Sequence, residues 1–396
     1  MATPGLVLTL LAALAPPASA QSLKPGEVLS TITVAPISAP HPVAGADGRL
    51  HLAYELMATN PSRLFVTLDK IESLDPSGAV LDVLDGDRLA AATQAWGGGG
   101  LTLAPGASAA VFLDVALPGA AAPPERIASR VTLTRQLAGP DGKPAPFPAT
   151  EPVPATVAFT GAEVVPGAPA VVLDPPLRGA GWAAINGCCA EITPHRGAII
   201  PVNGRPRLPE RFAIDWIRID PEGRIFEGDV AKVESYPSYG APVHAAAAGT
   251  VVNLYDAAEL QIPGGEAKGI TPRDVGGNML VVDIGGGAFA FYAHLQKNSL
   301  RVGLGDRVET GQVLALLGNT GNTNAPHLHF HVMDGPSPLD ADGLPFVLRS
   351  FTLEGTLPDD GLDALAAGGQ ARIDPAGAGP RADALPLNDQ VVDFGG

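Results

Sequence analysis

Three of the chain's eight histidines occupy alternate positions in the segment Ala325-Pro326-His327-Leu328-His329-Phe330-His331-Val332. Side chains at alternate positions of a β-strand point to one face, so this pattern predicts a strand with imidazoles on one surface and apolar side chains on the other. Imidazole is a common metal ligand and carries protons near neutral pH. The spacing therefore favours a metal-binding or proton-transferring surface on a sheet, and an exposed polar strand face over a core is the alternative.

The composition indicates a mainly β protein with room for two domains. The 396 residues include 48 glycines and 40 prolines, which favour many turns and few long helices. A hydrophobic content of 46% is enough to fill sizeable cores. The net charge of −16 argues against a nucleic acid or an anionic membrane surface as a partner.

The first twenty residues predict the compartment in which the chain works. Residues 6–15 are a short apolar core, and Ala18-Ser19-Ala20 fits a small-residue cleavage site before Gln21, as in a secretory signal peptide. No later segment is an uninterrupted apolar run long enough to span a membrane. We therefore expect an extracytoplasmic protein, periplasmic or secreted, without a membrane span.

The pattern after the signal peptide predicts two β domains. Residues 21–160 contain short alternating runs, such as those at 64–69 and 111–117, and predict an immunoglobulin-like β-sandwich. A Pro-rich linker is expected at 161–180, an antiparallel β-sheet domain at 181–355, and a mobile Ala- and Gly-rich tail at 356–396. Within that tail, residues 391–394 are a candidate docking strand.

The two cysteines of the chain are neighbours, Cys188 and Cys189. In an oxidising compartment they can bond to each other in a small ring or to other chains. They could also act as metal thiolates, but two in succession make an unusual ligand pair. A structural or redox role is therefore favoured over a zinc site.

Four motifs in chain order resemble those of the lysostaphin/LytM-type zinc endopeptidases. They are Tyr292-Ala293-His294-Leu295, Gly305-Asp306-Arg307-Val308-Glu309-Thr310-Gly311-Gln312, Gly318-Asn319-Thr320-Gly321 and Pro326-His327-Leu328-His329-Phe330. Enzymes of this family are extracytoplasmic and cut the peptide cross-links of bacterial peptidoglycan. The resemblance extends over roughly residues 211 to 333 and implies the family's peptidase fold there.

The resemblance implies a zinc site and assigns roles to four residues. Asp215 and His329 match zinc ligands of the family. His327 matches a catalytic base or orienting group, and His294 matches a group that stabilises the transition state or shuttles protons. The implied cofactor is Zn²⁺, and the implied partners are peptidoglycan peptides.

One position departs from the family's H-x-x-x-D motif, because Arg211 stands four residues before Asp215 where the family has histidine. Arginine stays protonated and offers no lone pair to a metal. If residues 211 and 215 share a strand face, a third ligand must come from elsewhere, and the strand period turns Glu210 to the opposite face. The candidate substitutes are His195, His331 and His244. On this interpretation, Arg211→His should raise metal affinity.

Two functions remain open at this level. The first is a secreted zinc metalloendopeptidase that hydrolyses peptide bonds of peptidoglycan. The second, favoured by Arg211, is a degenerate protein that binds peptidoglycan or regulates another cell-wall hydrolase. The long Gly-rich loop at 256–277 is expected along the substrate cleft, with a flexible insertion as the alternative.

Overall fold

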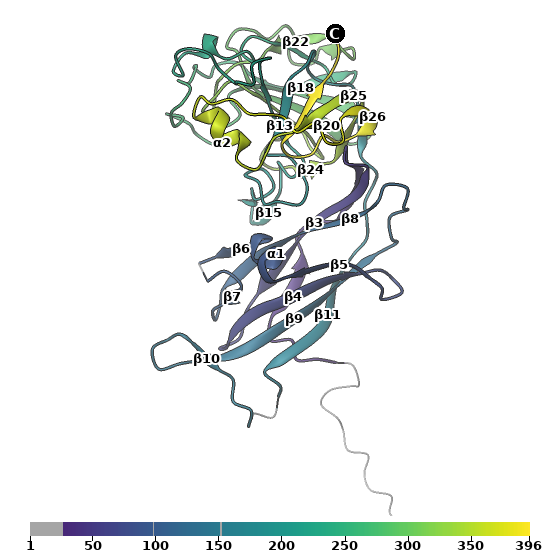
Figure 1. The fold of residues 1–396 in the computed structure, drawn as a ribbon, viewed down its shortest axis with the longest axis vertical. Coiled ribbons are helices and arrows are strands. Elements are labelled where there is room, and N and C mark those ends of the chain that lie inside the picture. The colour runs from purple at the N-terminus through teal and green to yellow at the C-terminus, as the bar shows by residue number, and fades with distance from the viewer. Residues whose placement is uncertain (1–26, 98, 151–152) are drawn as a thin grey trace, which may run out of the picture.

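The computed structural model describes residues 27–97, 99–150 and 153–396, which form two β-rich bodies stacked along the long axis of the molecule (Figure 1). The expected signal peptide at 1–20 lies outside the described residues. Strands dominate both bodies, as the composition predicts.

The N-terminal body is a sandwich of two sheets. The first sheet contains β1 (Thr33–Pro36), β2 (His41–Ala44), β3 (Arg49–Thr59), β6 (Thr93–Trp96) and β8 (Ser108–Pro118). The second contains β4 (Phe65–Leu74), β5 (Val80–Asp85), β7 (Thr102–Leu103), β9 (Ile127–Ala138), β10 (Pro144–Pro146) and β11 (Thr156–Val164). Alternate side chains of both sheets, such as Leu52 and Val131, are fully buried in one shared core. The predicted sandwich is confirmed.

The C-terminal body is organised around a twelve-stranded sheet. Its main path follows β12 (Val171–Leu173), β25 (Phe346–Thr356), β27 (Gln390–Asp393), β13 (Trp182–Ile185), β16 (Ile214–Arg218), β23 (Leu328–Met333), β20 (Ala288–Leu295), β19 (Asn278–Gly285), β18 (Gly249–Tyr255) and β21 (Arg307–Val308). Two further strands extend it, β24 (Gly343–Leu344) and β26 (Gly379–Ala384). Most pairings are antiparallel, as expected, and β12 pairs with β25 in parallel.

Small elements complete the chain. Two short ribbons pair β14 (Ile200–Val202) with β15 (Arg205–Arg207) and β17 (Pro242–His244) with β22 (Val313–Leu316). The helical elements are α1 (Gly86–Ala91), α2 (Gly361–Ala366) and the 3₁₀ turn η1 (Val233–Ser235). None of the helices in the described residues is long and apolar enough to cross a membrane.

Three adjacent strands, β16, β23 and β20, carry the residues that the motifs single out. Asp215 faces His329 across the β16–β23 pair, and Ala293 faces His329 across the β20–β23 pair. On the other side of β23, Leu328, Phe330 and Val332 are fully buried in the core. The alternation predicted from the sequence is therefore present, and the polar face of β23 lies opposite the core.

The expectation of a mobile tail at 356–396 is wrong. Strand β27 lies inside the large sheet between β25 and β13, and both Val391 and Val392 are fully buried. Strand β26 adds to the outer side of β25. The Ala- and Gly-rich composition suggests mobility, but Val391 and Val392 are buried in two different apolar clusters, and the candidate docking strand at 391–394 overlaps β27.

The two bodies share a hydrophobic core where they meet. Val43, Ala46 and Ala53 of the sandwich are buried in the same cluster as the central strands of the C-terminal body. The backbone of Gly45 also forms a bridge to Leu385. The sandwich is thus packed against the C-terminal body as part of one structure.

Candidate metal centre

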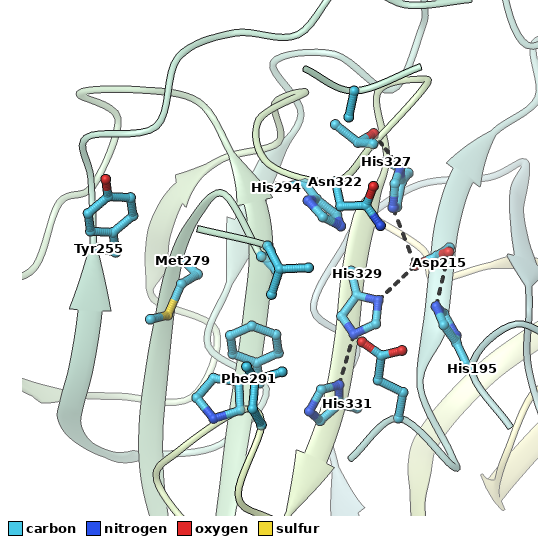
Figure 2. Close-up of a pocket in the computed structure, with 18 of the residues that line it drawn as sticks. His195, Asp215, Tyr255, Met279, Phe291, His294, Asn322, His327, His329 and His331 are labelled. Carbon is cyan, nitrogen blue, oxygen red and sulfur yellow. Dashed lines mark hydrogen bonds and ion pairs between the residues drawn. The ribbon is translucent and has the colours of Figure 1, made fainter. Parts of the chain in front are cut away.

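A cleft of about 1030 Å³ opens over the polar face of β16, β23 and β20 (Figure 2). It is lined by all four residues to which the family motifs assign roles and by two of the candidate substitutes: His195, Asp215, His294, His327, His329 and His331. The side chains come from three strands and two loops, and Figure 2 shows His195, His327 and His329 directed at Asp215 and His331 directed at His329.

The Asp215 carboxylate is the centre of this cluster. Its Oδ1 lies 2.9 Å from Nδ1 of His329 and 3.3 Å from Nε2 of His327. Its Oδ2 lies 3.2 Å from Nε2 of His195 and accepts a 2.8 Å hydrogen bond from the amide of Asn186. One carboxylate therefore contacts three imidazoles within a largely buried site.

Three of these groups fit a divalent metal ion. Single donor atoms of His195, Asp215 and His329 lie within 4.8 Å of one another. Two imidazoles and a carboxylate form a known ligand set for catalytic zinc, which leaves a position for water or substrate. His195 is thus placed where the sequence lacks a ligand at position 211.

The remaining ring nitrogens of both histidines are held by further groups, as is usual around bound metals. Nδ1 of His195 lies 3.1 Å from the carbonyl oxygen of Ala213 and donates to it, and this bond directs Nε2 toward Asp215. Nε2 of His329 lies 2.9 Å from Nδ1 of His331. His331 therefore orients His329 and belongs to the outer support of the site.

His327 and His294 lie on the other side of Asp215. Nδ1 of His327 lies 2.8 Å from the carbonyl of Ala325, and this bond leaves Nε2 directed at Asp215. Nδ1 of His294 lies 2.7 Å from the carbonyl of Thr320. The two imidazole rings are 4.6 Å apart between centroids. Both residues can exchange protons with a molecule bound in the cleft.

The backbone at His294 adopts φ of 60°, in the left-handed region that non-glycine residues rarely occupy. Its N–H donates to the carbonyl of Gly276, which belongs to the loop after β18. Uncommon backbone conformations of this kind are held by surrounding contacts and occur often at functional sites. The backbone conformation therefore supports a functional role for His294.

Electrostatics favour positive charge around Asp215. Burial raises the pKa of Asp215, but His195 and His327 beside it hold that pKa well below its usual range. Burial lowers the pKa of His195, yet the Asp215 carboxylate outweighs this and raises the pKa to about 9. The pKa of His327 is raised for the same reason. A site that favours protons on two imidazoles also suits a metal cation.

Two other histidines are neutral in character. Burial, followed by the nearby His327 and His329, lowers the pKa of His294 well below its ordinary value. Burial and His329 do the same to the pKa of His331. Neutral imidazole at both positions is consistent with hydrogen bonding and positioning near a cation.

The expected placement of Arg211 is wrong. Residues 209–212 form a turn before β16, so Arg211 and Asp215 share no strand face. The Arg211 guanidinium turns to the sandwich, where Nη1 lies 3.3 Å from Oε2 of Glu55. Glu210, expected on the opposite face, lines the cleft instead. Both expectations assumed that residues 210 and 211 belong to the strand of Asp215, but these residues lie in the turn before it.

The other candidate ligands are accounted for. His244 lies on β17, where its Nδ1 lies 2.9 Å from the carbonyl of Gly311, and it does not line the cleft. Cys188 and Cys189 form a disulfide with each other, so neither offers a thiolate. Of the three substitutes named from the sequence, His195 alone joins Asp215 and His329 in the ligand cluster.

Sequence reasoning missed Asn186, whose amide bonds to Asp215. No motif or periodicity marks this residue, because it follows the short strand β13 in an irregular loop. The loop at 256–277 does border the cleft, through residues such as Glu266 and Arg273. The length and glycine content of this loop are the sequence features that predict its place beside the cleft.

The sheet and its loops thus gather five buried histidines and an aspartate around one cleft. Residues 233–341 match the family described as Peptidase family M23, in agreement with the lysostaphin/LytM-type resemblance of the motifs. The Glycyl-glycine endopeptidase ALE-1 of Staphylococcus capitis is 34% identical over 101 residues. That match covers 26% of this chain and 24% of the relative, so the chain spans about a quarter of the relative's length.

Solved structures of the same kind are also similar. The catalytic domain of lysostaphin from Staphylococcus simulans is 21% identical, with 42% of this chain and 88% of that chain covered and a TM-score of 0.23. A peptidase M23 structure from Pseudomonas aeruginosa is 15% identical, with 67% and 86% covered and a TM-score of 0.25.

Proposed function

We propose that the chain is a secreted zinc metalloendopeptidase that hydrolyses peptide bonds of bacterial peptidoglycan. The observation that carries the proposal is the convergence of His195 with Asp215 and His329, whose donor atoms lie within 4.8 Å of one another. The ligand set is complete without a histidine at position 211. The expected signal peptide and the M23 match support the compartment and the substrate class.

The alternative, a degenerate protein that binds peptidoglycan or regulates another hydrolase, rested on Arg211. Its guanidinium lies in an ion pair with Glu55 and does not pair with Asp215. A cation at 211 therefore neither fills nor repels the metal position. The retained cluster of buried polar groups favours catalysis, since burying so many without a function is costly.

The proposed chemistry divides between the metal and the protein. A zinc ion held by His195, Asp215 and His329 would act as a Lewis acid and lower the pKa of water to about 7. His327, which lines the cleft and is oriented by the bond from its Nδ1 to the carbonyl of Ala325, would accept a proton from the attacking water. His294, whose Nδ1 donates to the carbonyl of Thr320, would shuttle a proton through its Nε2. The loop at 256–277 borders the bound peptide.

Zinc content of the purified mature protein tests the ligand set. We expect one zinc per chain in the wild type, and loss of zinc in His195→Ala and His329→Ala because each removes a ligand. His244→Ala is the matched control, since His244 lies outside the cleft and should leave zinc bound. A zinc-free wild type, or full zinc in His195→Ala, would overturn the proposed ligand set.

Hydrolysis of purified peptidoglycan tests the activity. His327→Ala should keep its zinc but release new amino groups from peptidoglycan roughly 10²- to 10⁴-fold more slowly, because it lacks the proton acceptor. The S. capitis relative is described as a glycyl-glycine endopeptidase, so glycine-containing cross-links are the first substrate to test. Equal rates for His327→Ala and wild type would contradict the assigned role.

A further inference from the structure

The loop that carries His195 lies between the metal site and the sandwich. It runs from the end of β13 to the start of β14 and contains no strand. His195 points into the cleft, whereas the next residue, Arg196, is fully buried in the opposite direction. A displacement of Arg196 would therefore move the ligand beside it.

Arg196 is held mainly by the sandwich. Its Nη2 donates a 2.6 Å hydrogen bond to the carbonyl of Leu113 on β8, and its guanidinium lies 5.5 Å from the centre of the Phe112 ring. Its Nη1 donates to the carbonyl of Cys189, within the same loop. Its Nε lies 3.6 Å from Oε1 of Glu55 on β3. Neither of these last two atoms has a hydrogen-bond partner among the described residues, so their ion pair is what compensates both.

Glu55 also holds the segment that leads to Asp215. Its Oε2 lies 3.3 Å from Nη1 of Arg211, in the turn that precedes β16, and accepts a 2.6 Å hydrogen bond from the hydroxyl of Ser38. The Glu55 side chain is 0% exposed. One buried carboxylate of the sandwich thus contacts an arginine in each of the two segments that supply ligands to the cleft.

Buried charges require partners, and removing one partner leaves the other uncompensated. Without the Glu55 carboxylate, two buried guanidinium groups would face each other across the domain boundary. The favourable response is for one or both segments to move toward solvent. The segment with Arg196 has no strand to restrain it, so the His195 loop is the part that should move.

We propose that Glu55 is a positioning residue for the metal site, which fixes His195 through Arg196 and the turn before Asp215 through Arg211. This inference rests on the proposed function for its catalytic meaning. It assigns the N-terminal sandwich a part in building the centre. It also explains why arginine at position 211 is compatible with a functional site.

The test compares Glu55→Gln with Glu72→Gln. Glu72 is a largely buried carboxylate of the sandwich that also pairs with an arginine, but its two 2.8 Å hydrogen bonds from Arg130 lie on the other sheet. Amide hydrogen exchange of residues 186–199 is measured before zinc is added, and zinc affinity by chelator competition. We expect Glu55→Gln to speed exchange in this loop at least tenfold and to weaken zinc binding at least tenfold, with Glu72→Gln unchanged in both.

A second variant guards against a failure of Glu55→Gln to fold. Glu55→Met/Arg211→Met removes one charge of each sign and refills the space with apolar side chains, which buried ion pairs often tolerate. Faster loop exchange and weaker zinc binding are again expected, because Arg196 has lost its carboxylate. Cobalt-substituted protein should also show an altered visible absorption spectrum, which a general loss of stability would not produce.

The two proposals fail in distinguishable ways. A wild type that binds no zinc overturns the proposed function, whereas loop exchange still decides whether Glu55 positions the loop. Wild-type exchange at 186–199 together with zinc affinity within twofold of wild type, in either folded variant, would overturn the positioning role.

Discussion

At the residue scale, the metal centre depends on which side chain arrives beside Asp215 and His329. The family pattern places a histidine four positions before the aspartate, and this chain has Arg211 there. The structure brings His195 to within 3.2 Å of Asp215 and turns Arg211 toward Glu55. The candidate ligand is therefore His195, which the motif does not include, and the residue at the motif position, Arg211, forms an ion pair instead.

This arrangement reverses the sequence-based expectation for Arg211→His. We now expect no gain in zinc affinity, because the side chain at 211 points to the sandwich rather than the cleft. The free energy of unfolding should fall by about 3 kcal/mol, since Glu55 loses a buried ionic partner. Urea unfolding and chelator competition measure the two effects. The double variant Arg211→His/His195→Ala should bind no zinc, and wild-type affinity in that variant would show that position 211 can reach the metal.

At the scale of elements, the sequence predicts the histidine strand β23 more directly than it predicts the C-terminal strand β27. Strand β23 alternates imidazole and apolar side chains, so its two faces are predictable from local spacing alone. Strand β27 is four residues long and lies in an Ala- and Gly-rich region. Its place between β25 and β13 is decided by the neighbours that it joins.

The contribution of β27 can be measured with one buried valine and one exposed valine. Val392→Ala should lower the free energy of unfolding by about 2 to 3 kcal/mol, because it leaves a cavity in the core. Val172→Ala on β12 is the control, since Val172 is 43% exposed and should change stability by less than about 0.5 kcal/mol. Equal effects in denaturant titrations would indicate that β27 does not complete the core.

At the scale of the whole molecule, the sandwich and the peptidase-like body are joined by apolar and ionic contacts. Val43, Ala46 and Ala53 enter the core of the C-terminal body. Glu55 pairs with arginines of that body across the same boundary. These shared contacts should resist independent movement of the two bodies, unlike a connection through a flexible hinge alone.

We therefore expect calorimetry of the mature protein to show one cooperative unfolding transition, because loss of either body exposes shared core and unpaired charges of the other. The ratio of calorimetric to van't Hoff enthalpy should be close to one. Two well-separated transitions would contradict this coupling. Glu55→Gln should lower the temperature of the transition, and Glu72→Gln provides the comparison within the sandwich.

The sequence alone determined the features that follow from local spacing and chain order. These are the β class and the histidine strand, where the two-residue period of a strand sets the geometry. The residues Asp215, His294, His327 and His329 were named from the resemblance of short motifs to a known family. The long loop at 256–277 could be placed near the cleft for its length and glycine content.

Only the tertiary structure shows which candidate lies beside Asp215 and His329. The sequence left His195, His244 and His331 open, and the irregular loop that contains His195 has no period that predicts where its side chains point. The choice of His195 depends on packing of its loop against the sandwich, including the burial of Arg196 beside Glu55. Such contacts join residues far apart in the chain, and their geometry exists only once both bodies are folded together.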